Sequence, residues 1–275
     1  MTGLNLTGLD GKVAVVTGAG RMKSIGRDIA VELAKAGADV VLTGTGRPPE
    51  RFPDDEKAAG WRDIASVAEE IEAAGRKALP LVSDVADEAA VRNLLAQTLS
   101  EFGRVDFVVN NAGAARGPDR VPVVDMPIDA WDTVLRVNLR GAFLVSKIFG
   151  QQLIDAGNGG VIVNISSIAG KAMGPNMAAY VASKAGLQGL TASMSGEVGR
   201  YGIRVNAICP GLVDTSRMAD VFANPDFDAR AMRIPIGRAG LGEDIGWAAV
   251  YLCSDQGSWI TGQSINIDGG NQVAH

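Results

Sequence analysis

Residues 12–26 read KVAVVTGAGRMKSIG, and this stretch decides the fold class. The apolar run Lys12–Thr17 is typical of a buried strand, glycines follow at positions 18 and 20, and a helical pattern begins at Ile25. In a strand–turn–helix of this kind, glycines let the backbone approach a pyrophosphate whose charge the helix N-terminus attracts. The stretch therefore predicts a doubly wound α/β fold that binds a dinucleotide.

The rest of the chain continues the alternation of strands and helices. Short runs rich in Val and Ile are expected to be strands: Lys12–Thr17, Asp39–Thr43, Lys77–Val82, Val105–Asn110, Gly160–Ser166, Ile203–Cys209 and Ser264–Ile267. Longer periodic stretches are expected to be helices: Ile25–Ala36, Asp63–Ala74, Glu88–Phe102, Asp129–Ala156, Ala178–Arg200 and Glu243–Ser254. We expect one Rossmann-like domain over residues 1–275, with a parallel sheet of about seven strands covered by helices on both faces.

Composition excludes several kinds of site. With 47% hydrophobic and 21% charged residues, the chain can bury a core of useful size. The one histidine is the last residue, His275, which excludes a Ser-His-Asp triad, a Cys-His dyad and an HExxH zinc site. Cys209 and Cys253 lie far apart in apolar runs, so we interpret both as core residues and expect no metal site. An acid–base group must then be Tyr, Lys, Asp or Glu.

The charge pattern bears on partners and location. The net charge is −5, which gives no overall basic field for nucleic acid or an anionic membrane. No stretch approaches the ~18 apolar residues of a membrane span, and residues 1–10 do not resemble a signal peptide. We expect a cytoplasmic protein with no nucleic-acid or membrane partner.

Long connections are expected to surround the ligand site. Gly44–Arg62 either lines the ligand crevice or is a surface insertion, and its acidic run Asp54–Glu56 is interpreted as a solvated face. The segments 114–128, 170–177 and 212–241 are expected to be substrate loops, because they follow strands at the edge where ligands bind in such folds.

Tyr180 and Lys184 form a candidate catalytic pair. They lie at positions i and i+4 of an expected helix and therefore share one face. An ammonium beside a phenol favours the phenolate, which makes the tyrosine a better proton donor and acceptor near neutral pH. Such a pair is common by chance. Ser167 lies thirteen residues upstream of Tyr180, at the end of the fifth expected strand, and Asn138 lies in the expected helix before that strand.

In these motifs the chain resembles the short-chain dehydrogenase/reductase family over nearly its whole length, with motifs of the 3-oxoacyl-carrier-protein reductase branch. The resemblance rests on the glycine-rich turn, on NNAG at 110–113, on Pro210-Gly211 and on the Asn, Ser, Tyr and Lys set. The turn departs from the family pattern: it is two residues longer, and Ser24 stands where a glycine is expected, as in the related enoyl-acyl-carrier reductases.

The resemblance implies a role for each of the four residues. Tyr180 gives or takes the proton of the substrate oxygen, and Ser167 hydrogen-bonds that oxygen; Ser166 is the less favoured alternative, because neighbouring side chains on a strand face opposite sides. Lys184 also binds the cofactor ribose. Asn138 holds a water that relays protons to Lys184.

Cofactor contacts are expected at the ends of several strands. From the turn, the end of the second strand and the resemblance, the expected cofactor-binding residues are Gly18, Arg21, Ser24, Ile25, Arg47, Asp84, Val85, Asn111, Ala112, Gly113, Tyr180, Lys184, Pro210, Gly211, Val213 and Thr215. Residues 40–49 contain no acid to take a ribose 2′-hydroxyl, and Arg47 and Arg21 could hold a 2′-phosphate. We therefore predict a preference for NADP(H), with NAD(H) as the alternative.

The function expected from the sequence is hydride transfer between a nicotinamide cofactor and a ketone or secondary alcohol of small size. Alternatives are an enoyl reductase, in which six residues rather than three separate Tyr and Lys, a sugar epimerase or dehydratase of the extended branch, and a redox sensor that binds cofactor without turnover. The resemblance further implies a homo-tetramer, with Asp129–Ala156 and Ala178–Arg200 in one interface and Ile260–His275 in another.

Overall fold

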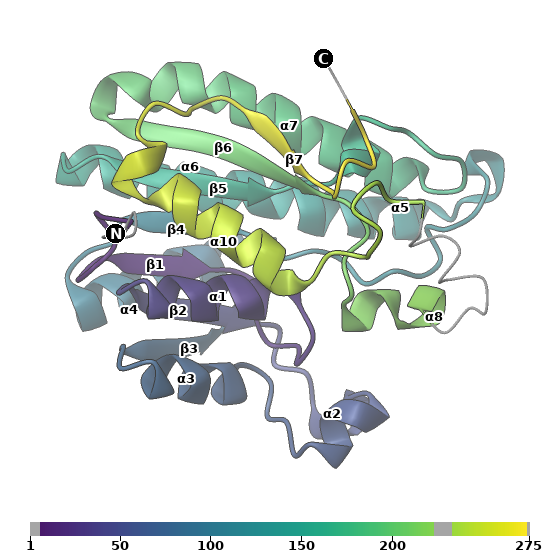
Figure 1. Ribbon diagram of the computed structural model, residues 1–275, viewed down its shortest axis with the longest axis horizontal. Helices are drawn as coiled ribbons and strands as arrows, with labels where there is room; N and C mark the ends of the chain where they lie inside the picture. Colours follow the sequence, from purple (N-terminus) through teal and green to yellow (C-terminus); the bar gives the residue numbers. More distant parts are fainter. Residues whose placement is uncertain (1–5, 223–232, 274–275) are drawn as a thin grey trace.

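A parallel sheet organises the molecule (Figure 1). Within residues 6–222 and 233–273, which this computed structural model describes, seven strands pair in the order β3-β2-β1-β4-β5-β6-β7. The strands are β1 (Val13–Val16), β2 (Asp39–Gly44), β3 (Ala78–Val82), β4 (Phe107–Asn110), β5 (Gly160–Ile165), β6 (Ile203–Pro210) and β7 (Ser264–Ile267). Part of the expected substrate loop 212–241, and His275, lie outside the described residues.

Helices cover both faces of the sheet (Figure 1). The described α-helices are α1 (Ile25–Lys35), α2 (Asp54–Ala58), α3 (Ile64–Ala73), α4 (Glu88–Phe102), α5 (Ile128–Leu135), α6 (Ala142–Ala156), α7 (Ala178–Val198), α8 (Ala219–Phe222) and α10 (Gly242–Cys253). Alternation along β1 sends Ala14 and Val16 toward the core shared with α1, α3 and α10. Val13 and Val15 point into the core shared with α4, α6 and α7. The doubly wound fold expected from the sequence is confirmed.

The strand order reverses between β1 and β4, and this reversal positions the site. The chain runs outward from β1 to β3 and then returns to place β4 on the other side of β1. Just beyond the two strands, Thr17 N donates to Val109 O at 3.0 Å, and Asn111 N donates to Thr17 Oγ1 at 3.1 Å. A crevice at the carboxyl ends of such strands is where open α/β sheets bind ligands.

Most element bounds agree with the expectations to within two residues, but the single helix expected over Asp129–Ala156 is wrong. A π-helical segment, Arg136–Gly141, interrupts it between α5 and α6. Gly141 packs closely on Val85, since a Cβ added there would lie 2.7 Å from Val85 Cγ2, and Arg140 donates to Ala86 O. The wider turn buries Asn138, and periodicity alone does not show such a local insertion of one residue.

From the sequence we expect neither a membrane-spanning segment nor a metal site, and the described residues bear on both expectations. None of the helices there is both long and apolar enough to cross a membrane. The same residues contain no group of three or more His, Cys, Asp or Glu that could hold a metal ion. Cys209 and Cys253 are both buried and unpaired, as interpreted from the sequence.

Candidate active site

The pair Tyr180 and Lys184 lies in the first two turns of α7, against the end of β5. Lys184 is 4% exposed, and its Nζ donates to Ile165 O at 2.7 Å. The same Nζ lies 5.8 Å from the centre of the Tyr180 ring. The helical spacing therefore brings the ammonium and the phenol together at the carboxyl edge of the sheet.

Ser166 and Ser167 differ in what their hydroxyls do. Ser166 Oγ donates to Lys184 O at 2.9 Å and accepts from Gln188 Nε2 at 3.1 Å, so it fastens β5 to α7. Ser167 Oγ accepts from Ala169 N at 3.1 Å at the start of a short 3₁₀ turn. Because the Ser166 hydroxyl is used in packing, Ser167 is the better placed of the two to meet a substrate oxygen.

Asn138 connects the NNAG segment to α7. Its Oδ1 accepts from Ala114 N at 2.8 Å, and its Nδ2 donates to Ser183 Oγ at 3.0 Å. Ser183 Oγ in turn donates to Tyr180 O at 2.7 Å. The π-helical turn thus joins the loop after β4 to the backbone of the candidate catalytic tyrosine.

The glycine-rich turn is held against the loop after β4. Gly18 has a φ of +73°, and a Cβ there would lie 2.7 Å from Ala112 Cα, so only glycine fits. Asn111 Nδ2 donates to Thr17 O and Gly18 O, each at 2.9 Å. Ser24 caps α1 by accepting from Arg27 N at 3.2 Å, which leaves the positive end of the helix dipole at the turn.

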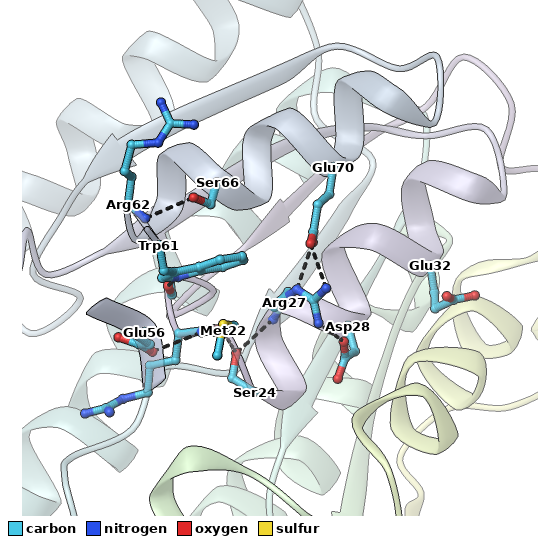
Figure 2. Close-up of polar contacts among 12 residues, drawn as sticks. Met22, Ser24, Arg27, Asp28, Glu32, Glu56, Trp61, Arg62, Ser66 and Glu70 are labelled. Carbon is cyan, nitrogen blue, oxygen red and sulfur yellow. Dashed lines mark hydrogen bonds and ion pairs between the residues drawn. The ribbon is translucent and has the colours of Figure 1, made fainter. Parts of the chain in front are cut away.

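The insertion Gly44–Arg62 packs on this turn (Figure 2). Glu56 Oε1 accepts from Met22 N at 3.0 Å, and Trp61 Nε1 donates to Gly20 O at 2.7 Å. Glu56 is fully buried, so the interpretation of Asp54–Glu56 as a solvated face is wrong for this residue, although Asp54 and Asp55 are exposed. A carboxylate can be buried here because a backbone N–H and an arginine satisfy it.

That arginine is Arg47. Its Nη1 lies 3.0 Å from Glu56 Oε2, and its Nε lies 3.2 Å from Asp63 Oδ2. Asp63 has a φ of +56°, and its carboxylate sits so close to Gly20 that a Cβ there would collide with it. Arg47 Nη2 is buried and has no hydrogen-bond partner among the described residues. Burial, and then the charge of Arg47, lowers the pKa of Arg21 on the neighbouring turn.

An ion-pair cluster fixes the start of α1 (Figure 2). Arg27 Nε and Nη2 donate to the two Glu70 oxygens on α3 at 2.8 and 2.7 Å, and Nη1 lies 3.2 Å from Asp28 Oδ1. The bond to Glu70 raises the pKa of Arg27. The guanidinium also lies 5.6 Å from the Trp61 ring, so the insertion, α1 and α3 hold the turn jointly.

The remaining expected cofactor positions lie along the same edge. Asp84 Oδ2 pairs with Arg136 at 3.0 Å beside buried Val85. Gly211, directly after β6, donates its N–H to Ile267 O at 3.1 Å. Thr215 and Val213 are buried in the segment that follows. These residues and the glycine-rich turn therefore lie at the carboxyl ends of their strands, the edge at which open α/β sheets bind ligands.

Comparison with known proteins agrees with this geometry. A family model described as "Enoyl-(Acyl carrier protein) reductase" matches residues 18–272. The chain belongs to the short-chain dehydrogenase/reductase family. It is 37% identical to "Short-chain dehydrogenase/reductase eriH" of Hericium erinaceus, over 94% of this chain and 96% of that protein. It is also 37% identical to "3-oxoacyl-[acyl-carrier-protein] reductase FabG" of Staphylococcus aureus, over 94% and 97%.

A solved structure shows the same architecture. A putative short-chain alcohol dehydrogenase from Sinorhizobium meliloti matches with a TM-score of 0.84 and 38% identity, over 95% of this chain and 96% of that one. The chain is thus an NAD(P)-dependent oxidoreductase of the short-chain dehydrogenase/reductase family.

Two arginines that the sequence did not mark as candidates lie near Tyr180. The guanidinium carbon of Arg120 is 4.5 Å from the centre of the Tyr180 ring, and Arg120 Nε is 3.5 Å from Asp119 Oδ2. Arg217 Nη2 donates to Gly113 O at 2.8 Å and to Ala114 O. No motif marks either arginine, because the path of its loop decides where it points.

Burial and the charge of a neighbouring arginine change the pKa of Lys184. Burial lowers the pKa of Lys184 to about 7, and the positive charge of Arg217 acts in the same direction. Burial is also the main reason why the pKa of Arg217 is lowered, with Arg21 and Arg120 adding to the effect and Tyr180 and Asp119 opposing it. Lys184 can therefore exchange a proton near neutral pH.

Proposed function

We propose that the chain transfers a hydride between a nicotinamide cofactor and a ketone or secondary alcohol, with Tyr180 as the proton donor and acceptor. The observation that carries the proposal is the convergence of Tyr180, Lys184 and Ser167 at the edge of the sheet where the glycine-rich turn lies. Asn138 joins this group through Ser183. The composition supports it, because the acid–base step needs no histidine.

Each side chain then has a defined task. A bound nicotinamide supplies or accepts the hydride. Tyr180 protonates the substrate oxygen as it becomes an alkoxide, and Ser167 hydrogen-bonds the same oxygen. Lys184, with its pKa of about 7, holds the ribose and passes protons to the tyrosine. Asn138 holds a water that relays protons to Lys184.

A substrate panel tests the proposal. The pure protein is assayed for NADPH and NADH oxidation with ketones, and for the reverse reaction with secondary alcohols. Turnover that needs Tyr180 supports the proposal. A redox sensor would bind cofactor but turn over none of the panel. An α,β-unsaturated thioester tests the enoyl reductase named by the family model; only three residues separate Tyr180 from Lys184, so we expect no turnover of it.

We predict a preference for NADP(H), held by Arg21 and Arg47. The prediction is supported by Arg47 Nη2, a buried donor without an acceptor among the described residues, beside a second arginine. Glu56 and Asp63 balance the charge of the two arginines, so we expect a smaller preference than two free arginines would give. Arg21→Ala should cost about 1.5–3 kcal/mol with NADPH only, measured as kcat/KM for both cofactors.

To test Arg47 in the same way, Glu56 has to be replaced as well. Arg47→Ala alone leaves the buried Glu56 carboxylate without its cation, so Arg47→Ala is compared within a Glu56→Gln background. Equal losses with NADPH and NADH, or a native preference for NADH, contradict the assignment of the two arginines.

We predict a homo-tetramer. A groove between α5, α6 and α7 supports it, because Leu135, Leu139, Phe143 and Leu190 line it together with Asp132, Arg136 and Arg140. Near the C-terminal segment, Trp259 is 99% exposed, which fits the second interface. Light scattering at micromolar concentration should give four times the chain mass of 28.5 kDa; a monomer mass contradicts the prediction.

A further inference from the structure

Three cationic side chains lie near Tyr180, although the proposed proton transfer needs only one of them, Lys184. Among the residues that the structure describes, Lys184 and Arg120 lie with a charged group 5.8 and 4.5 Å from the centre of the Tyr180 ring. Arg217, on the loop after β6, donates to Gly113 O and Ala114 O and lies near enough to Tyr180 and Arg120 to interact with them electrostatically. Asp119, 3% exposed, is the carboxylate paired with Arg120.

This arrangement is costly without an anion. Cations that are close together and partly removed from water repel one another, and each loses hydration. The Asp119 carboxylate offsets the charge of Arg120, whereas the two acceptors of Arg217 given above are backbone carbonyls, which carry no net charge. Arg120 Nε is buried and makes no hydrogen bond within the described part of the chain, although Asp119 Oδ2 lies 3.5 Å from it. A negative ligand placed between Arg120 and Arg217 would supply both the charge and the acceptor.

We propose that the substrate carries a carboxylate, bound by Arg120 and Arg217 beside the carbonyl that Tyr180 protonates. A carboxylate presents two oxygens in one plane, which match the fork of a guanidinium group. Arg120 comes from loop 114–128 and Arg217 from loop 212–241, two of the segments expected to decide specificity. The inference rests on the proposed function and narrows its substrate to oxo acids and hydroxy acids.

Arg217 lies at the boundary between the expected cofactor site and a substrate loop. Its guanidinium contacts the carbonyl of Gly113, at the end of the NNAG motif, and that of Ala114, the first residue of a substrate loop. A Cβ added to Gly113 would lie 3.2 Å from Arg217 Nη2 and 3.4 Å from Asn138 Oδ1. The arginine therefore lies between the loop after β4 and the candidate proton relay.

The test compares each acid with its own ester. 3-Oxobutanoate and methyl 3-oxobutanoate, and 4-oxopentanoate and its methyl ester, are assayed with saturating cofactor. In at least one of the two pairs, we expect kcat/KM for the acid to be at least tenfold higher than kcat/KM for its ester. Arg217→Ala and Arg120→Ala should lower that acid-to-ester ratio at least tenfold, and Arg217→Lys, which keeps the charge but loses the fork, should lower it less.

A matched control lies at the other end of α7. Arg200 stacks on Tyr201 with its guanidinium carbon 4.8 Å from the ring centre, so Arg200→Ala removes the same group from a similar stack away from the site. It should leave the acid-to-ester ratio unchanged. Equal kcat/KM for acids and esters overturns the inference, and so does a Kd for cofactor that rises in Arg217→Ala while the ratio stays constant.

A binding measurement separates failure of this inference from failure of the proposed function. Calorimetry of the cofactor-saturated protein with butanoate and with butanamide reads the carboxylate site without any turnover. Preferential binding of butanoate that is lost in Arg217→Ala supports the site even if no ketone reacts. Ketone turnover that depends on Tyr180, with no preference for butanoate or for the acids, leaves the proposed function standing and overturns the carboxylate site.

Discussion

Replacing Tyr180 with Phe should lower kcat for ketone reduction by about 10²–10⁴-fold, the range that a positioned general acid contributes. The change removes one oxygen and keeps the ring that packs against Arg120 at 4.5 Å and faces Lys184. Cofactor binding should therefore change less than threefold. Single-turnover kinetics and cofactor titration by fluorescence measure the two quantities separately.

Tyr201→Phe is the control for this prediction. Tyr201 lies just beyond α7, where Arg200 stacks on its ring and Arg200 Nη2 donates to its hydroxyl at 2.8 Å. Loss of that hydroxyl removes a phenol next to an arginine far from the site, so kcat should stay within twofold of the native value. Turnover of the Tyr180→Phe protein at a tenth of the native rate or more contradicts the role of Tyr180 as proton donor.

Residues set by local geometry could be predicted from the sequence. Tyr180 and Lys184 share a face because helical spacing fixes it. Ser167 and Asn111 follow strands, and the ends of neighbouring parallel strands meet at one edge of a sheet. Gly18 needs its positive φ wherever the turn runs close to Ala112. In each case a short range of sequence determines the position.

Residues that depend on loop paths could not be predicted in this way. Glu56 looks like part of an acidic surface run until Met22 N and Arg47 are seen to satisfy it. Asp63 reaches Gly20 only because the insertion folds back over the turn, where Trp61 Nε1 also donates to Gly20 O. Arg120 and Arg217 meet at Tyr180 from loops separated by about a hundred residues, and sequence spacing gives no sign of that meeting.

The burial of Lys184 has a consequence for stability. A lysine in the unfolded chain has a pKa near 10.5, whereas burial lowers that of Lys184 to about 7 in the folded protein. Between these two values the unfolded state binds more protons than the folded state, so stability rises with pH across the window from about 7 to about 10. Below pH 7 the ammonium is charged in both states, and the full cost of burying it remains.

Lys184→Met should therefore stabilise the fold while abolishing its chemistry. Met has similar length and no charge to desolvate, and replacing buried charges with apolar groups is often worth about 1–4 kcal/mol. The gain in unfolding free energy should be greatest at pH 6 and smaller at pH 9, measured by urea unfolding of the cofactor-free protein followed by circular dichroism.

The same Lys184→Met variant should lose at least a hundredfold in kcat/KM and bind cofactor more weakly. Lys77→Met, at an exposed lysine, should show no gain that depends on pH. A Lys184→Met protein that is destabilised to the same extent at both pH values would mean that the hydrogen bond to Ile165 O outweighs the cost of burying the ammonium.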